Sequence, residues 1–261
     1  QRVASGALTD GTAVVVNSDG TVSVAISPFS SSVVFEEGSI VYPSAVYDTN
    51  SNKVVVAYRD GGNSNYGTAV VGTVSGDTIT FGTPVVFESA NTIYIVSVFD
   101  SNSNKVVISY YDGGNGGYGT SIVGTVSGSS ISFGTPVVFE SAGAVYISSV
   151  FDDVSNKVII AYTDQGNSNY GTSVVGTVSG TSISFGTPVV FNNALVSATS
   201  VAYDTNAEKA VVFYRDSGGS SNGEAKVGTI SGTSISFGSV AVFDSGTNSN
   251  FYSSTYDANA Q

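Results

Sequence analysis

Three loops in this chain combine oxygen-bearing side chains with glycine, a combination that can hold a metal ion or a polar ligand. They read "RDGGNSNYGT", "YDGGNGGYGT" and "TDQGNSNYGT", and "RDSGGSSNGE" is a looser fourth copy. We call the first three the Asp–Tyr loops. Their candidate binding residues are Asp60, Asn63, Asn65 and Tyr66, then Asp112, Asn115 and Tyr118, then Asp164, Asn167, Asn169 and Tyr170.

Two interpretations of the Asp–Tyr loops are open. Calcium prefers several clustered oxygen ligands, but each loop offers a single carboxylate and lacks the DxDxDG spacing of an EF-hand. Asp can instead begin a turn by accepting backbone hydrogen bonds, and glycine supplies the positive φ that such turns need. We therefore predict turns, with no metal and no cofactor, and keep binding of another polar ligand as a hypothesis. Turns are also predicted where Asp follows an aromatic residue, at Asp48, Asp100, Asp152 and Asp204.

Aromatic residues at a second repeated position could stack on a sugar. Tyr42, Tyr94, Tyr146 and Phe251 occupy equivalent positions, and Ala198 interrupts the set. Tyrosine combines a flat apolar face with a hydroxyl group, which suits carbohydrate binding. The alternative is that these rings pack between structural units or cover the preceding loop.

Catalysis is not expected. The chain has no Cys and no His, so a thiolate nucleophile, an imidazole base and a zinc site are excluded. Paired carboxylates can hydrolyse glycosides, but such a site needs a few singular residues in one place. The carboxylates that we count as unrepeated fall at different positions of the repeat and do not indicate one site: Glu36, Glu37, Asp77, Asp153, Glu208 and Glu224.

A repeat organises all of these residues. Equivalent phenylalanines recur every 52 residues, at Phe29, Phe81, Phe133, Phe185 and Phe237. One period contains four runs rich in Val, Ile, Tyr, Phe and Thr, separated by Gly, Asn, Asp and Ser, with no helical periodicity. Four antiparallel strands in a period of this size are typical of a β-propeller blade. The sequence therefore predicts an all-β, five-bladed propeller, and a parallel β-helix is the second choice.

The phase of the repeat predicts how the ring closes. Residues 11–36 align with the third and fourth strands of a repeat, and the segment "NFYSSTYD" near the C-terminus aligns with a first strand. We therefore expect one blade built from both ends, which removes exposed sheet edges. Residues 1–10 form an arm or linker, and residues 11–261 form a single domain. A second strand for the closing blade is missing, so we expect the natural chain to continue, and the alternative is a closing blade of only three strands. In such a ring, the residues equivalent to Tyr42 in the successive repeats surround one mouth of the central channel.

Composition restricts the partners. Only 11% of residues are charged, and 20 acidic residues against 8 basic ones give a net charge of −12. Nucleic acids and anionic membrane surfaces need clustered basic residues, so neither is an expected partner. The sequence has no apolar run long enough to span a membrane.

The text "NKVVVAYRDGGNSNYGTAVVGTVSG", with "ISFGTPVVFESA" in a later copy, resembles repeats of virion-structural and tail-associated proteins of marine tailed phages, in particular cyanophages. The opening "SGALTDGTAVVVNSDGTVSV" looks like a β module of phage tail and fibre proteins. The resemblance covers residues 7 to 256 and supplies no catalytic residues. It implies a surface-exposed virion component in several copies per particle, with other virion proteins as partners and a host-surface glycan or receptor as ligand. The alternatives are a decoration or adaptor protein of the virion with no receptor role, and a secreted lectin-like propeller.

Overall fold

The computed structural model describes residues 14–19, 21–24, 32–219, 221–245 and 252–257. The described chain is built of antiparallel β-strands, as predicted, and its one helix is the short 3-10 helix η1 (Gly113–Asn115). No helix in the described ranges is long and apolar enough to cross a membrane. The strands are β1 (Val14–Val16), β2 (Val22–Val24), β3 (Ile40–Asp48), β4 (Lys53–Asp60), β5 (Tyr66–Ser75), β6 (Thr78–Phe81), β7 (Val85–Asp100), β8 (Lys105–Asp112), β9 (Tyr118–Ser127), β10 (Ser130–Phe133), β11 (Val137–Asp152), β12 (Lys157–Asp164), β13 (Tyr170–Ser179), β14 (Ser182–Phe185), β15 (Val189–Asp204), β16 (Lys209–Asp216), β17 (Gly223–Ser231) and β18 (Ser234–Asp244).

From residue 40 onward the described chain forms four similar antiparallel units, which we call blades 1 to 4. Blade 1 consists of β3, β4 and β5, with β6 and the first half of β7 as its outer edge. The same order recurs in blades 2 and 3, and β18 is the outer strand of blade 4. This order agrees with the four runs that the repeat predicts.

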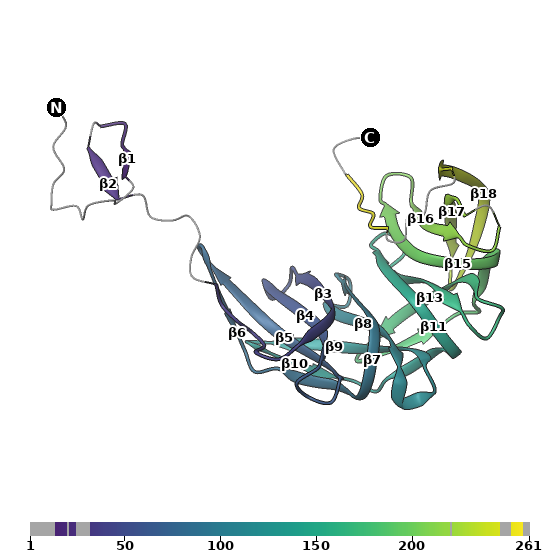
Figure 1. The fold of residues 1–261 in the computed structure, drawn as a ribbon, viewed down its shortest axis with the longest axis horizontal. Coiled ribbons are helices and arrows are strands. Elements are labelled where there is room, and N and C mark those ends of the chain that lie inside the picture. Colours follow the sequence, from purple (N-terminus) through teal and green to yellow (C-terminus); the bar gives the residue numbers. More distant parts are fainter. Residues whose placement is uncertain (1–13, 20, 25–31, 220, 246–251, 258–261) are drawn as a thin grey trace.

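Three long strands join neighbouring blades. β7 pairs with β5 through residues 85–91 and with β8 through residues 92–100, so it ends blade 1 and begins blade 2. β11 and β15 have the same double role. Each of the three strands is 16 residues long. The blades are therefore linked without a loop and follow a curved path (Figure 1).

The hydrophobic core lies between successive blades, in three clusters that each combine residues of two blades. A phenylalanine of the outer strand stands in each cluster, and the exposed fractions are 7% for Phe87, 6% for Phe139 and 3% for Phe191. The Phe139 ring lies 5.2 Å from the ring of Tyr162 and 5.6 Å from that of Phe185, both in the next blade. Glycine is required at Gly119, because a Cβ atom there would lie 2.4 Å from the Phe139 ring.

The predicted closure of the ring is not seen in the structure. β1 and β2 pair only with each other among the described strands, and Figure 1 shows this hairpin apart from the blades. The described C-terminal segment, residues 252–257, contains no strand. Residues 1–13, Phe29, Phe251 and residues 258–261, which the prediction also involves, lie outside the described residues.

The C-terminal segment nevertheless makes the contact expected of a fifth first strand. The hydroxyl oxygens of Ser200 and Ser254 are 2.7 Å apart. Those of Ser44 and Ser97, which stand at the equivalent places in blades 1 and 2, are 2.8 Å apart. The segment therefore lies beside β15 as β7 lies beside β3.

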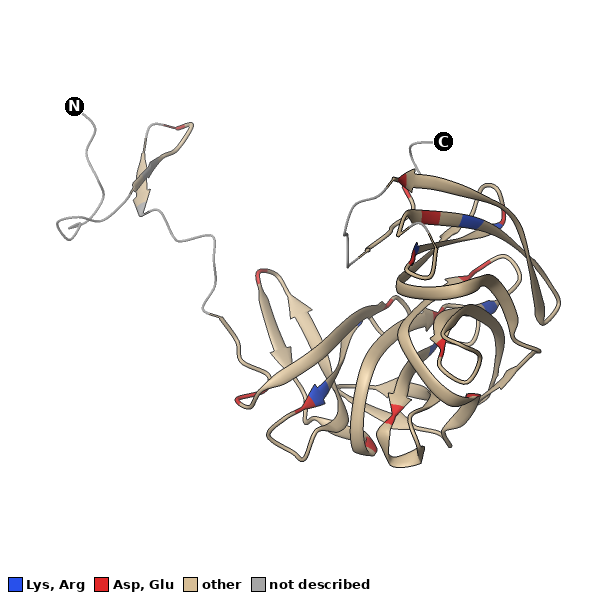
Figure 2. Cartoon of the chain, turned by 45° about the vertical axis from the view of Figure 1, so that its right-hand side comes forward, with Lys and Arg blue, Asp and Glu red and all other residues tan. Residues whose placement is uncertain are grey.

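Charged residues are sparse over the whole fold. Figure 2 shows the acidic residues mostly at strand ends and in turns, and the few basic residues spread over several strands. The described part of the chain thus presents mainly uncharged side chains to its surroundings.

Candidate functional site

Each first strand contains a residue in a backbone conformation that side chains normally avoid. The pairing register skips between Val41 and Ser44 in blade 1, and it skips at the equivalent place in the other blades. The residues at these bulges have positive φ angles: 54° at Tyr42, 54° at Tyr94, 51° at Tyr146 and 53° at Ala198. A bulky residue with positive φ is an outlier, and here the conformation recurs in all four blades, with tyrosine in three and alanine in the fourth, so it is a property of the fold.

The bulges bring the three tyrosine rings together. The ring centroids of Tyr42 and Tyr94 are 5.4 Å apart, and those of Tyr94 and Tyr146 are 5.3 Å apart. Both ring pairs are tilted, within the range of favourable aromatic contacts. The guanidinium carbon of Arg59 lies 5.4 Å from the centroid of the Tyr42 ring, which is cation–π distance.

These rings line a cavity of about 450 Å³, which we call the tyrosine pocket. Its wall is mainly apolar and includes Ile95, Ile147 and Ala198 beside the tyrosines, with Tyr252 of the C-terminal segment. Tyr146 is 38% exposed, so part of this residue is accessible from outside. Burial, followed by the neighbouring tyrosines, raises the pKa of Tyr94 above its ordinary value. This phenol therefore stays neutral at physiological pH.

The tyrosine pocket gathers most of one predicted set of site residues. Tyr42, Tyr94 and Tyr146 line it together, and Ala198 takes the fourth place, as the alignment indicates. Phe251 lies outside the described residues, and its neighbour Tyr252 lines the pocket. Whether this pocket binds a ligand stays a prediction.

The Asp–Tyr loops lie at the same end of the blades as the starts of the first strands. Asp60 pairs with Ile40 at the start of β3, and the amide of Gly61 donates to the carbonyl of Ser39, so the first loop lies beside the entry to its first strand. None of the Asp–Tyr loop residues lines the tyrosine pocket.

The carboxylates of the Asp–Tyr loops form turns, as predicted. Asp60 Oδ1 accepts a hydrogen bond from the amide of Asn63 at 3.0 Å, and Asp112 Oδ1 accepts one from the amide of Gly114 at 2.9 Å. Asp164 Oδ1 accepts hydrogen bonds from the amides of Gly166 and Asn167. Asn65 and Asn169 have left-handed backbones. The other predicted loop residues divide by exposure: Asn63, Asn115 and Asn167 are exposed, and Tyr66, Tyr118 and Tyr170 are half-buried.

The turns predicted after the aromatic residues are also present. Asp48 Oδ1 accepts the amides of Asn50 and Ser51, and Asp100, Asp152 and Asp204 make the same pair of bonds. The described residues hold no group of three or more acidic, His or Cys side chains placed to bind a metal. The prediction that no metal binds still needs a measurement.

A repeated hydrogen bond between blades was not predicted from the sequence. The hydroxyl of Tyr110 donates to Glu88 Oε2 at 3.2 Å, and the hydroxyl of Tyr162 donates to Glu140 Oε2 at 3.0 Å. Tyr58 makes a longer contact of this kind, 3.4 Å, with Glu36. Counting Glu36 as unrepeated was therefore wrong. The signal was present in the sequence, because each of these glutamates follows a phenylalanine of the repeat.

Burial is the main influence on these glutamates. It raises the pKa of Glu88 and of Glu140, and the nearby carboxylates of Asp112 and Asp164 raise it further, while the tyrosine hydrogen bond lowers it. The pairs are shared between an outer strand and the second strand of the next blade. Their evident role is to join blades.

Comparison with known proteins supports the fold. No protein-family model and no curated protein sequence matches the chain. An intramolecular trans-sialidase from Ruminococcus gnavus is similar with a TM-score of 0.55 and 8% identity, over 86% of this chain and 72% of that one. At this identity the likeness is one of fold alone.

Two further solved structures are similar at TM-scores below one half. One is the Aleuria aurantia lectin in complex with alpha-methyl-L-fucoside, with a TM-score of 0.48 and 17% identity, over 84% of this chain and 66% of the lectin. The other is a mutant of AofleA from Arthrobotrys oligospora, with a TM-score of 0.49 and 10% identity, over 81% of this chain. The chain spans 62% of the length of AofleA.

Proposed function

We propose that this chain is a non-catalytic carbohydrate-binding module whose ligand occupies the tyrosine pocket. The observation that carries the proposal is the left-handed backbone of Tyr42, Tyr94 and Tyr146. Glycine adopts this conformation without a steric penalty, whereas other residues lose about 1–2 kcal/mol. A bulky residue kept there despite the penalty indicates that its side chain has a role, and strained residues concentrate at binding sites.

The chemistry of the tyrosine pocket suits a neutral sugar. The apolar face of a sugar ring can stack on a tyrosine, and a phenol hydroxyl can bond to a sugar hydroxyl. The net charge of −12 disfavours acidic glycans. Glycans on a cell surface are multivalent, so weak sites on several copies of the module gain avidity.

The resemblance to marine phage repeats supports a virion-surface setting for this activity. In that setting the module acts in host attachment, with other virion proteins as neighbours. We also propose that the working form is a closed five-bladed ring. The contact between Ser200 and Ser254 supports a fifth blade next to blade 4.

A second candidate function is decoration of the virion without a receptor role. It is favoured by the last blade, where Val227 of β17 and Phe243 of β18 are 47% and 51% exposed, whereas the equivalent residues of blades 1 to 3 are at most 7% exposed. Apolar side chains that are buried in the other blades and exposed here mark an interaction surface. Either a fifth blade or a neighbouring protein would cover them.

Replacement of Tyr94 by glycine tests the proposal. Tyr94→Gly removes the ring and suits the left-handed backbone, so binding at the tyrosine pocket should be lost while the fold is kept. Tyr47→Ala is the matched control, since Tyr47 is 51% exposed at the other end of a first strand. The measurement is binding of the labelled protein to a glycan array, with mass spectrometry of bound glycans to detect cleavage. Equal array binding by Tyr94→Gly and the unchanged chain contradicts the proposal, and cleaved glycans contradict its non-catalytic part.

A further inference from the structure

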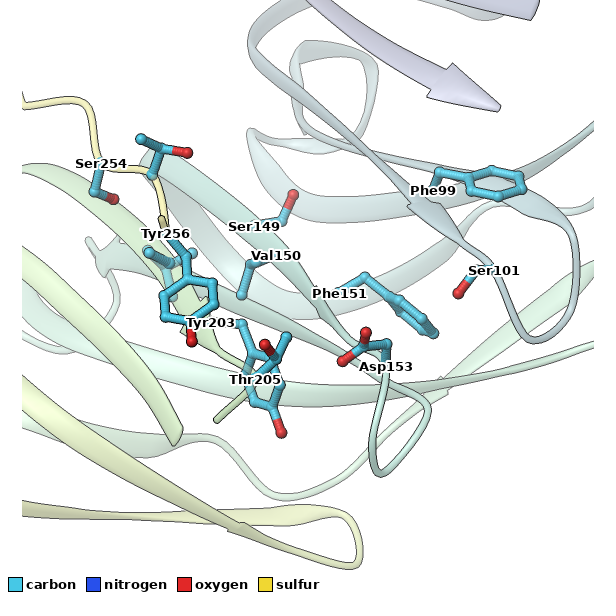
Figure 3. A pocket seen from close by; sticks show the side chains of 13 residues that line it. Phe99, Ser101, Ser149, Val150, Phe151, Asp153, Tyr203, Thr205, Ser254 and Tyr256 are labelled. Carbon is cyan, nitrogen blue, oxygen red and sulfur yellow. The ribbon is translucent and has the colours of Figure 1, made fainter. Parts of the chain in front are cut away.

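A second cavity lies at the opposite end of the first strands. Its volume is about 490 Å³, and it is formed by the ends of β7, β11 and β15 with residues 254–256 of the C-terminal segment (Figure 3). We call it the hydroxyl pocket, because Ser149, Thr205 and Ser254 are among the side chains that line it. It shares no residue with the tyrosine pocket.

Two hydroxyl groups of this pocket lack hydrogen-bond partners. Ser149 Oγ and the Tyr256 hydroxyl are buried, and neither has a partner among the described residues. A buried polar group without a partner is unfavourable, and most such groups in proteins are satisfied by protein, water or ligand. Neither oxygen is accessible to a water-sized molecule in this conformation, so a ligand in the cavity can bond to Ser149 only after the serine side chain turns about its Cα–Cβ bond.

The repeat explains why Ser149 is left unpaired. In blade 2 the equivalent Ser97 is bonded to Ser44 of blade 1, with 2.8 Å between their oxygens. Val96 occupies the place beside Ser149 that Ser44 occupies beside Ser97. Valine has no hydroxyl, so it cannot make this bond. Valine in place of serine therefore leaves the Ser149 hydroxyl without the partner that Ser97 has.

One carboxylate completes the wall. Asp153 lines the hydroxyl pocket at a position where the other repeats have Thr49, Ser101 and Thr205. Figure 3 shows Asp153 close to Ser149 along the chain, and aromatic rings line the same cavity. A carboxylate accepts hydrogen bonds through both oxygens, so it can bind two neighbouring hydroxyl groups of one ligand.

We propose that the hydroxyl pocket is a second carbohydrate site, which binds a neutral sugar with adjacent hydroxyl groups. Asp153 accepts two of these hydroxyls, Ser149 bonds to another once its side chain turns toward the cavity, and the ring of Phe151 supports the apolar sugar face. A metal ion is disfavoured because the pocket offers one carboxylate. An acidic sugar is disfavoured because Asp153 and the net charge of −12 repel it. This proposal does not rest on the tyrosine pocket.

The test is titration of the isotope-labelled chain with methyl glycosides, followed by NMR of backbone amides. The panel is the methyl glycosides of glucose, mannose and galactose at millimolar concentration. Methyl glucuronide serves as the charged match to methyl glucoside. We expect a neutral glycoside to shift the amides of residues 149–153 and 205, and the glucuronide to shift them less.

Variants separate the two sites. Loss of hydrogen bonds to a charged acceptor should weaken binding of the neutral glycoside about tenfold in Asp153→Asn. Ser149→Ala should weaken it to a smaller degree, and Tyr94→Gly should leave these shifts unchanged. If no neutral glycoside shifts these amides, or if Asp153→Asn and Ser149→Ala both keep the affinity of the unchanged chain, the proposal is wrong. Loss of array binding in Tyr94→Gly alone concerns only the tyrosine pocket.

Discussion

Truncation of Phe139 should show how much of the stability lies between the blades. Phe139 is 6% exposed, and its ring contacts Tyr162 and Phe185 of the next blade. Burial of a phenylalanine side chain contributes about 1.5–3 kcal/mol. The cavity left by the deleted ring and the lost ring contacts add to this, so we expect Phe139→Ala to cost about 3–5 kcal/mol.

The repeat provides a matched control in Phe243, which has the same position in blade 4. It is 51% exposed, and it contacts Phe213 and Tyr252 at ring-centroid distances of 5.9 and 5.4 Å. About half of its surface is already in water, and little cavity would remain after truncation. We therefore expect Phe243→Ala to cost about 0.8–1.5 kcal/mol, since about half of the transfer free energy is lost.

The assay is chemical denaturation of both variants and the unchanged chain, followed by circular dichroism and tyrosine fluorescence. Midpoints give free energies when the denaturant slopes agree among the three proteins. A cost below about 1.5 kcal/mol for Phe139→Ala would refute the reasoning, because it is less than the transfer free energy of a buried ring. Equal costs for Phe139→Ala and Phe243→Ala would instead show that a fifth blade covers Phe243 in solution.

Three other outcomes follow from the loops and the glutamates. The melting temperature should be the same in EDTA and in millimolar calcium, because a ligand that binds only the folded state must raise it; a rise of several degrees would mean that the Asp–Tyr loops bind calcium. Asp112→Ala should lower the free energy of unfolding by about 1 kcal/mol through loss of a turn hydrogen bond, measured by denaturation. Because the pKa of Glu88 and of Glu140 is raised above the ordinary 4.5 in the fold, their stabilising contribution is present below that pH and is lost as pH rises through the raised values. Glu88→Gln with Glu140→Gln should therefore be more stable than the unchanged chain at neutral pH, and this advantage should vanish in acid. Parallel stability curves against pH would contradict the assignment.

The strand order could be predicted from the sequence because one signal is repeated. A single run of Val, Ile and Tyr is ambiguous between a strand and a buried helix. The same run recurs in several repeats and is bounded each time by glycine and Asp turns, so a strand is favoured over a helix. The turns at Asp60 and Asp100 were predicted for the same reason, since the Asx turn depends on local sequence.

The left-handed tyrosines could not be predicted from the sequence. Positive φ is normally signalled by Gly or Asn, and Tyr94 carries neither signal. The bulge belongs to the pairing of each first strand with its second strand, since the register shifts between Ile93 and Val96 in β7 and at the equivalent place in β3. The lone hydroxyl of Ser149 was missed for a similar reason, since it depends on the residue beside it in the previous blade.

The long shared strands have a consequence for the way the chain is made. The cluster between blades 1 and 2 includes Val55 of β4 and Ile131 of β10, so it cannot form until the second repeat has left the ribosome. Each emerging repeat then covers the apolar face of the one before it and presents a new apolar face of its own. Folding would thus advance from the N-terminus by one repeat at a time, as expected for arrays held by nearest-neighbour contacts. Among the described residues, Val227 and Phe243 on the corresponding face of blade 4 are 47% and 51% exposed.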